Sequence, residues 1–148
     1  MRNHACISEC KNPLVPVEDA GVRAVFCNPK RKAYRTFDVD GCLVTEGLAA
    51  DFAVEELGTG LAVVELKGRN VEHALKQVSE TVKHFRDARD YTGRLCALIV
   101  SRQSPLGSAT IAKQRLIFAK RHGGAALHVH SSQRSFVLSD LLTAGRRK

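Results

Sequence analysis

The sequence predicts an α/β protein in which a mixed β-sheet is flanked by helices, an α/β/α sandwich. Several apolar segments of strand length come first and then alternate with two longer segments of helical periodicity, an order typical of such folds. The composition, with 44% hydrophobic and 26% charged residues, is that of a globular protein. The length of 148 residues suits one domain with its own core. We therefore treat residues 1–148 as a single domain.

Strands are predicted where apolar or alternating residues lie between glycine, proline and asparagine. Residues 61–67 begin with a continuous apolar run, which predicts a central strand covered on both faces. Residues 1–20 contain Pro13 and Pro16 and are predicted to be irregular. The predicted strands are residues 22–27, residues 34–44 with a tight turn at Asp40-Gly41, residues 51–56, residues 61–67 after a turn at Gly58-Thr59-Gly60, residues 94–101 and residues 125–130.

Two helices are predicted from apolar periodicity and from their end signals. The first begins after Asn70, a favourable N-cap, and carries one apolar stripe. The second covers residues 108–122, with Ser108 as its cap and Gly123-Gly124 as its stop. Residues 132–148 are predicted to form a basic C-terminal tail that includes one helical turn at residues 139–142.

The charge is strongly basic, since 23 Lys and Arg against 15 Asp and Glu give a net charge of +8. Such an excess favours an anionic partner, nucleic acid above all. Residues 103–139 contain no Asp or Glu. A solvated helix face is the alternative for the basic residues of this stretch. The cations predicted to contact a nucleic-acid backbone are Lys30, Arg31, Lys32 and Arg35 near the N-terminus and Lys113, Arg115, Lys120 and Arg121 on the second helix.

Two features predict a cytoplasmic protein without a membrane anchor. No apolar run approaches the roughly 20 residues of a membrane helix, and residues 1–12 lack the apolar block of a signal peptide. The five cysteines are odd in number and scattered, which does not indicate a disulfide framework. His4, Cys6 and Cys10 could be metal ligands, but no C-x-x-C pair accompanies them. A loose, reduced N-terminal segment is the simpler interpretation.

Three histidines near the C-terminus raise the same question of a zinc site. His128 and His130 share one face of a predicted strand, and His122 precedes it. Further ligands at the usual zinc spacing do not follow. Phosphate contact or an ordinary surface position is therefore the preferred interpretation of these side chains.

An acid and a base end the predicted central strand. Glu65 and Lys67 are two residues apart, so they project from the same face. Asp51 begins the preceding strand. In an antiparallel hairpin centred on Gly58, Asp51 lies directly opposite Glu65, and the loop has three or five residues. A slip of one residue would place the two acids on opposite faces. The sequence thus allows two carboxylates and one ammonium group to converge.

Converging carboxylates predict a metal site. Two adjacent carboxylates repel one another, and a hard divalent cation resolves this repulsion. Mg²⁺ also takes phosphate oxygens, stabilises charge on a phosphodiester and lowers the pKa of a bound water, which Lys67 would orient. Glu-x-Lys alone is usually a solvated surface pair. On an apolar strand, however, burial of these charges costs free energy, which indicates a functional role. We therefore predict a phosphodiesterase site.

Other polar residues are candidates for the edge of this site. Those on the first helix flank its apolar stripe, and the alternative for them is the polar boundary row of any amphipathic helix. Those before Gly41 are near a strand end, and the second of them is most simply a turn residue. The candidates are Gln77, Thr81, His73 and His84 on the helix and Asp38 and Asp40 before Gly41.

The stretch from residue 48 to residue 81 resembles the active-site core of the PD-(D/E)XK nuclease superfamily, which includes restriction endonucleases, Holliday-junction resolvases and RecB-type nuclease domains. It reads LAADFAVEELGTGLAVVELKGRNVEHALKQVSET. The family pattern is an acid at a strand start, a hairpin into a strand ending Glu/Asp-x-Lys, and then a helix. Asp51, Glu65 and Lys67 match these positions, and Gln77 matches a glutamine that many members carry on that helix.

The resemblance implies a restriction-endonuclease-like fold, with residues 94–101 as the next strand. Two departures from the family pattern are visible: Ala50 stands where proline is usual, and Thr81 stands where RecB-type members often have tyrosine. Some members place an additional acid before the core, and Glu18 is the candidate for that position.

The resemblance also implies Mg²⁺ as cofactor, with Mn²⁺ as a substitute, held by Asp51, Glu65 and the backbone carbonyl of Leu66. Lys67 would position the attacking water and Gln77 would support the site. We expect a nuclease that hydrolyses phosphodiester bonds in DNA, as a homodimer or as a subunit in defence, repair or recombination. The alternative is a catalytically silent nucleic-acid-binding or assembly subunit. A metal-binding regulator that uses the Cys and His residues is a third possibility.

Overall fold

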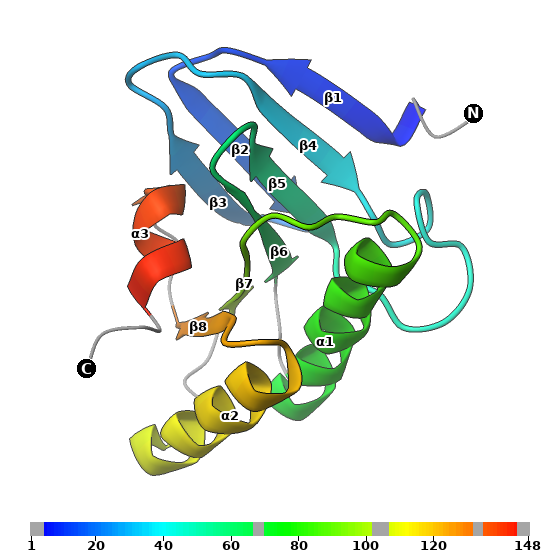
Figure 1. The fold of residues 1–148 in the computed structure, drawn as a ribbon, viewed down its shortest axis with the longest axis vertical. Coiled ribbons are helices and arrows are strands. Elements are labelled where there is room, and N and C mark those ends of the chain that lie inside the picture. The colour runs from blue at the N-terminus through cyan, green and yellow to red at the C-terminus, as the bar shows by residue number, and fades with distance from the viewer. Residues whose placement is uncertain (1–4, 67–69, 102–106, 132–134, 145–148) are drawn as a thin grey trace.

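The computed structural model describes residues 5–66, 70–101, 107–131 and 135–144. These residues form an α/β structure with a mixed sheet of six strands, a second sheet of three strands and three helices (Figure 1). The six-stranded sheet has the order β1 (Ile7–Cys10), β4 (Tyr34–Asp38), β5 (Phe52–Glu56), β6 (Gly60–Leu66), β7 (Leu95–Val100) and β8 (Ala126–His130). The smaller sheet has the order β2 (Leu14–Asp19), β3 (Val22–Cys27) and β9 (Ser135–Phe136). The helices are α1 (Val71–Asp87), α2 (Ser108–Arg121) and α3 (Leu138–Ala144).

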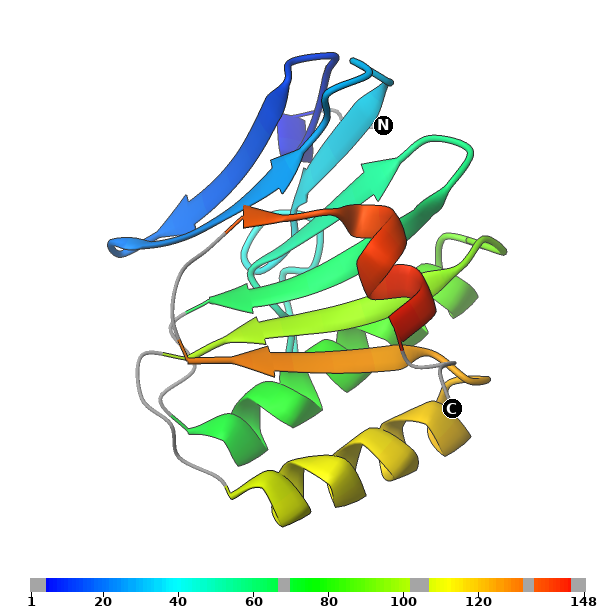
Figure 2. The same ribbon diagram turned by 90° about the vertical axis from the view of Figure 1, so that its left-hand side faces the viewer.

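The six-stranded sheet is antiparallel on one side and parallel on the other. Neighbouring strands from β1 to β6 pair antiparallel. Strands β6, β7 and β8 pair parallel, because α1 and α2 return the chain between them. Figure 2 shows the arrowheads of these three strands pointing toward the edge at which α1 and α2 begin. The mixed sheet that the sequence predicts is therefore confirmed.

Different layers cover the two faces of this sheet. Helices α1 and α2 cover one face, and the core there includes Val63, Ala74 and Phe118. The small sheet and α3 cover the opposite face (Figures 1 and 2), where Val64 and Leu138 belong to a second core. The predicted α/β/α sandwich is thus modified, since a three-stranded sheet supplies much of the second covering layer.

Strand β6 is the centre of both cores. All of its residues are buried, as the apolar run predicts for a strand covered on both faces. Leu61 and Val63 belong to the core beneath α1, whereas Ala62, Val64 and Leu66 belong to the core on the other face. By this alternation Glu65 projects from the α1 face.

The helix boundaries agree with the predicted ones, with one exception. Asn70 is the N-cap of α1, and its side chain accepts a hydrogen bond from the His73 backbone N–H. The N-cap of α2 is Gly107 and makes no side-chain capping bond, so the prediction of Ser108 as the cap is wrong. The helix begins one residue earlier than that prediction requires. At the other end, Gly123 and Gly124 have the positive φ values that end a helix.

The prediction that residues 1–20 are irregular is wrong. Residues 7–10 and 14–19 form β1 and β2. Pro16 is tolerated because β2 is an edge strand of the small sheet and pairs with β3 alone. Alternation in β2 buries Val15 and Val17, and this burial outweighs the missing proline donor.

The C-terminal tail predicted for residues 132–148 is also partly structured. Residues 135–136 form β9, and α3 extends beyond the predicted turn at 139–142. The reason is apolar burial, because Leu138, Leu141 and Leu142 are buried against the six-stranded sheet.

The expectation of a loose, reduced N-terminal segment is wrong as well. Pairing of β1 with β4 brings Cys6 next to the turn after β4, where it forms a disulfide with Cys42. Cys10, Cys27 and Cys96 are free thiols, and burial raises the pKa of Cys96 to about 12. His4 lies outside the described residues.

Among the residues that the structure describes, no helix is long and apolar enough to cross a membrane.

Candidate metal-binding site at one end of the central sheet

The β5–β6 hairpin has the register that the sequence predicts. Phe52 pairs with Val64 and Glu56 pairs with Gly60, which leaves a three-residue loop. Gly58 stands at the centre of that loop with a φ of 85°, a conformation that glycine adopts without steric cost. Extension of the same register by one residue places Asp51 opposite Glu65, at the end of the sheet away from the loop. We call this the carboxylate end and the opposite one the hairpin end.

Main-chain hydrogen bonds fix both carboxylates at the carboxylate end. Glu65 Oε1 accepts a bond of 3.2 Å from the backbone N–H of Asp51. Asp51 Oδ2 accepts a bond of 2.9 Å from the backbone N–H of Leu66. Glu65 is 6% exposed and Asp51 is half-buried. Each acid therefore binds the main chain of the opposite strand, and the two side chains share the α1 face.

Helix α1 holds the chain segment that leads into Asp51. Gln77 Nε2 donates a bond of 3.0 Å to the carbonyl oxygen of Ala49. The backbone N–H of Ala50 donates a bond of 2.8 Å to Thr81 Oγ1, which itself donates to the Gln77 carbonyl at 2.9 Å. Thr81 is 1% exposed, so water competes little for these bonds. Gln77 and Thr81 thus position the main chain directly before Asp51.

The third residue of the predicted site, Lys67, lies outside the described residues. It follows Leu66 directly in the chain, and Leu66 is both the last residue of β6 and the hydrogen-bond donor to Asp51. The first described residue after Lys67 is Asn70, the cap of α1, so the N-terminus of α1 also belongs to the carboxylate end. The positive end of that helix dipole favours an anion there.

Two further acids are close to this end in the fold. Asp38 is the last residue of β4, pairs with Phe52 and is exposed. Asp40 lies in the turn that follows and is bridged to Val44, as the prediction of a turn residue requires. Glu18 belongs to β2 in the small sheet, which covers the face opposite α1. The structure therefore does not bring Glu18 into the group around Asp51.

The first basic group lies at the hairpin end and not beside the carboxylates. Lys32 is 3.4 Å from Glu56, and Arg35 is 2.8 Å from Glu9 and 3.6 Å from Glu55. Lys30 and Arg31 are exposed in the connection between β3 and β4. Ion pairs within the protein thus engage Lys32 and Arg35, which the sequence assigned to a nucleic-acid backbone.

The acids at the hairpin end have a different environment from Asp51 and Glu65. Glu56 accepts hydrogen bonds from Tyr34 Oη at 2.8 Å and from Thr59 Oγ1 at 2.7 Å. Burial raises the pKa of Glu56, but the bonds from Thr59 and Tyr34, together with Lys32, outweigh burial and lower it. Burial raises the pKa of Tyr34 far above its ordinary value. These interactions tie β4 to the β5–β6 loop.

The second basic group lies on α2. Lys113, Lys120 and Arg121 are exposed, as a solvated or ligand-binding face requires. Arg115 is directed back at the sheet, since its Nε donates a bond of 3.1 Å to the carbonyl oxygen of Leu127 in β8. Part of this group is therefore structural.

Two histidines, His122 and His128, make structural hydrogen bonds in the described part of the chain. His122 Nε2 lies 2.6 Å from Ser79 Oγ and connects the end of α2 to α1. His128 Nε2 lies 2.8 Å from the carbonyl oxygen of Leu141. Burial lowers the pKa of both side chains, and neighbouring cations lower it further. The hydrogen bond to Leu141 raises the pKa of His128 but does not outweigh burial. His73 is exposed, and burial followed by Arg89 lowers the pKa of His84.

Few side chains in the described residues are grouped so that they could bind a metal ion. No cluster of three or more His, Cys, Asp and Glu side chains that could hold a metal ion is found among them. The zinc interpretations of the histidines and cysteines therefore gain no support. Asp51 and Glu65, with the Leu66 carbonyl, remain a set of hard oxygen donors of the kind that Mg²⁺ takes together with waters and phosphate.

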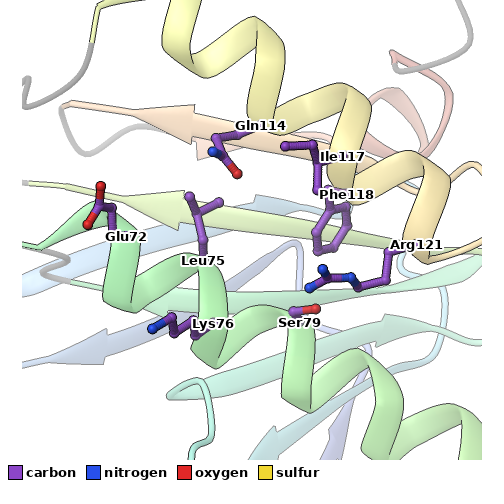
Figure 3. A pocket seen from close by; sticks show the side chains of 8 residues that line it. All are labelled: Glu72, Leu75, Lys76, Ser79, Gln114, Ile117, Phe118 and Arg121. Atoms are coloured by element: carbon purple, nitrogen blue, oxygen red, sulfur yellow. The ribbon is translucent and has the colours of Figure 1, made fainter.

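Two features of the site region could not be found from the sequence. One is the contact of Thr81 with the Ala50 main chain, for which the only signal is a hydroxyl residue beside the apolar stripe of a helix. The other is a groove between α1 and α2, to which Ser79 and Arg121 contribute (Figure 3).

Comparison of the chain with protein-family models, with curated proteins and with solved structures found no match.

Proposed function

We propose that this protein is a Mg²⁺-dependent nuclease that hydrolyses phosphodiester bonds in DNA, with a restriction-endonuclease-like fold of the PD-(D/E)XK type. The observation that carries the proposal is the register of the β5–β6 hairpin, which pairs Phe52 with Val64. Extended by one residue, this register has Asp51 opposite Glu65 at the carboxylate end. Their cross-strand hydrogen bonds hold the two acids in place before any metal binds. Preorganised ligands of this kind lower the cost of binding a cation.

The order of the surrounding elements supports the same family. An antiparallel hairpin ends in the strand that carries Glu65, a helix follows, and a parallel strand comes next. Gln77, which matches the family glutamine, supports the main chain before Asp51. Thr81 makes the neighbouring contact from the position where RecB-type members often have tyrosine. Both residues of α1 are thus positioning residues for Asp51.

The chemistry follows from the donor set. Asp51, Glu65 and the Leu66 carbonyl would hold Mg²⁺, which when bound stabilises charge on the phosphodiester and lowers the pKa of a coordinated water. Lys67 would orient the attacking water, and its ammonium group would favour hydroxide. The N-terminal end of α1 adds a positive dipole beside the phosphate. The resemblance further suggests a homodimer or a subunit of a larger assembly.

The test is cleavage of a substrate panel with matched variants. Supercoiled plasmid, linear duplex, single strands, a four-way junction and RNA are incubated with Mg²⁺, Mn²⁺ or EDTA. The variants are Glu65→Gln and Lys67→Ala. Glu56→Gln is the control, because it makes the same chemical change at the hairpin end of the same sheet. Glu65→Gln keeps a side-chain oxygen that can still accept the Asp51 N–H bond, so only the charge is lost.

We expect metal-dependent cutting of DNA by the wild type and by Glu56→Gln and none by the other two variants. Binding of Mn²⁺ is measured separately by titration calorimetry, and Glu65→Gln should weaken it. Cleavage that Lys67→Ala or Glu65→Gln leaves intact would refute the assigned site. Nucleic-acid binding without cutting or metal binding would favour the silent binding subunit instead.

A further inference from the structure

The groove between α1 and α2 is a hollow that the proposed nuclease site does not use. Its volume is about 290 Å³, at the lower end of the range for small-ligand sites. Each helix lines it with residues at the first, fourth, fifth and eighth positions of one stripe, from Glu72 to Ser79 on α1 and from Gln114 to Arg121 on α2. The groove is therefore an elongated space between two facing helix stripes, of a size that suits a small molecule.

The two ends of this groove differ in charge. Both helices begin at the same edge of the sheet (Figure 2), so Glu72 and Gln114 lie at one end and Ser79 and Arg121 at the other. Figure 3 shows Glu72 and Arg121 at these opposite ends. A rise of 1.5 Å per residue separates the ends by about 10 Å. An acid thus stands at one end and a guanidinium group at the other.

The middle of the groove is apolar. Leu75 of α1 and Phe118 of α2 face one another across it, with Ile117 at its outer side (Figure 3). Phe118 is only 5% exposed, whereas Leu75 is half-buried and Ile117 is 40% exposed. An apolar side chain of a ligand would remove the accessible parts of Leu75 and Ile117 from water, which is favourable.

The Arg121 end is suited to a carboxylate. Arg121 is exposed and lines the groove beside the hydroxyl of Ser79. After burial, three neighbouring cations led by Arg121 lower the pKa of His122, whereas one acid raises it, so this end is electropositive. Ser79 Oγ lies 2.6 Å from His122 Nε2, and a hydroxyl can make further hydrogen bonds besides that one. A carboxylate here would meet a guanidinium group and a hydroxyl.

The Glu72 end is suited to an ammonium group. Glu72 is exposed, and no ion pair engages it among the residues that the structure describes. The side-chain carbonyl of Gln114 is a second acceptor at this end. Lys76 is exposed one turn further along α1, midway between the ends, where its ammonium group can donate to carbonyl oxygens of a ligand.

These lining residues argue against two simpler occupants. A nucleic-acid backbone would bring phosphates beside Glu72 and would leave the apolar middle without a partner, since such contacts are made through phosphate and sugar. A fatty acid would match Arg121 and the apolar middle but would place its hydrocarbon end against the Glu72 carboxylate. A molecule with an ammonium group, an apolar body and a carboxylate matches all three parts of the groove.

We propose that the α1–α2 groove binds a short apolar peptide with free termini, about three residues long. Its ammonium group faces Glu72, its central side chain enters between Leu75 and Phe118, and its carboxylate faces Arg121. Three extended residues span about 10 Å, which matches the separation of the two ends. The site does not involve Asp51 or Glu65, so it stands or falls separately from the nuclease.

The test is titration of the ¹⁵N-labelled full chain with the tripeptide Ala-Leu-Ala, followed by ¹H–¹⁵N NMR spectra. Backbone signals of α1 and α2 should shift, and the shifts give the dissociation constant. Ala-Gly-Ala should bind about tenfold or more weakly, because it lacks the apolar side chain. The N-acetylated and the C-amidated forms of Ala-Leu-Ala should each bind about threefold more weakly, because exposed ion pairs contribute little free energy.

Matched variants assign each terminus to its end of the groove. Glu72→Gln should weaken binding of Ala-Leu-Ala about threefold and should not change binding of the acetylated form. Arg121→Gln should behave in the same way toward the amidated form. Glu80→Gln on α1 and Lys113→Gln on α2 are the controls, because both residues are exposed and neither lines the groove. Both controls should bind like the wild type.

Several results would overturn the proposal. Spectra that do not change at millimolar Ala-Leu-Ala, or that change outside α1 and α2, would reject a peptide site in this groove. Equal binding of Ala-Gly-Ala would reject the apolar contact. Equal binding of the acetylated form, with no effect of Glu72→Gln, would reject the ammonium end and leave a site for a simple carboxylate. Equal effects of the control variants would reduce the result to general electrostatic attraction.

Discussion

The two ends of the β5–β6 hairpin both carry a pair of acids, and the hydrogen bonds described for the two pairs come from different kinds of donor. At the carboxylate end, Asp51 and Glu65 accept hydrogen bonds from main-chain N–H groups of the facing strand. At the hairpin end, Glu56 accepts bonds from two side-chain hydroxyls and pairs with a lysine, and Glu55 pairs with an arginine.

The comparison separates acids that stabilise the fold, Glu55 and Glu56, from acids that are candidate metal ligands, Asp51 and Glu65. Lys32 and Arg35 pair with Glu56 and Glu55, hydroxyl groups donate to Glu56, and these contacts connect β4 to the hairpin. Main-chain donors at the carboxylate end fix the direction of the Asp51 and Glu65 carboxylates, as a pair of metal ligands would require. If the two pairs of acids have these roles, substitutions at the carboxylate end should reduce cleavage, and substitutions at the hairpin end should reduce stability.

The largest effect is expected from Asp51→Asn. The change removes one ligand charge, and removal of even an outer-shell partner of a metal typically costs about 10–100-fold. We expect DNA cleavage to fall by about a hundredfold or more, while the melting temperature stays the same or rises slightly because two neighbouring acids no longer repel. Plasmid cleavage and thermal unfolding measure both quantities. Glu55→Gln, at the hairpin end of β5, should leave the cleavage rate intact. An equal loss of cleavage in the two variants would mean that the two ends do not differ in function.

The opposite result is expected at the hairpin end from Glu56→Ala. This change leaves the buried Tyr34 hydroxyl and the Thr59 hydroxyl without their acceptor. We expect the free energy of unfolding to fall by about 1–3 kcal/mol, as measured by urea denaturation, with the cleavage rate per folded molecule unchanged. A Tyr34→Phe/Glu56→Ala double variant should cost less than the sum of the two single changes. Strict additivity would mean that the pair does not interact.

A smaller effect should follow from loss of the Thr81 hydroxyl, which supports the carboxylate end from α1. Thr81→Val keeps the side-chain shape but removes the acceptor of the Ala50 N–H. We expect the Mg²⁺ concentration for half-maximal cleavage to rise about tenfold, with weaker Mn²⁺ binding by calorimetry. Thr81→Ser restores the hydroxyl and should restore both values. If Thr81→Val changes only the melting temperature, Thr81 stabilises the helix without positioning Asp51.

The smallest effect concerns pH and the contact between α1 and α2. Burial, with Arg121, Lys83 and Arg86, lowers the pKa of His122 below its ordinary value of 6.5. The unfolded chain therefore binds the proton more readily, so the free energy of unfolding should fall as the pH drops below about 6.5 and level off below the folded pKa. Urea titrations at pH 8 and pH 5 would show this fall, and His122→Gln should reduce it. An undiminished fall in that variant would assign the pH dependence to other groups.

The arrangement around Asp51 could largely be predicted from the sequence because it rests on local rules. The glycine at the loop centre and the two-residue alternation of strands fix the register, and Asn70 marks the start of α1. The central, doubly covered position of β6 follows from its continuous apolar run. These signals lie within about 35 residues of one another, and no distant contact is needed to interpret them.

The remaining features depend on contacts between distant segments. The second sheet needs β3 to meet β9, which is more than 100 residues away, and short edge strands such as β2 carry weak periodicity. The ion pairs of Lys32 and Arg35 appear only once β4 lies between β1 and β5. The sequence shows the charge of these residues but not the ion pairs that they make within the fold.

Because of the Cys6–Cys42 disulfide, the stability of the chain depends on the redox conditions around it. The bond spans 36 positions and holds the outermost strand β1 beside the turn after β4. A closed loop of this size contributes about 4 kcal/mol in the chain-entropy view of cross-links. Thiol reductants would remove that contribution and free β1 to separate from the sheet. The strands that carry Asp51 and Glu65 lie two and three places inward, so the edge of the sheet would loosen before its centre.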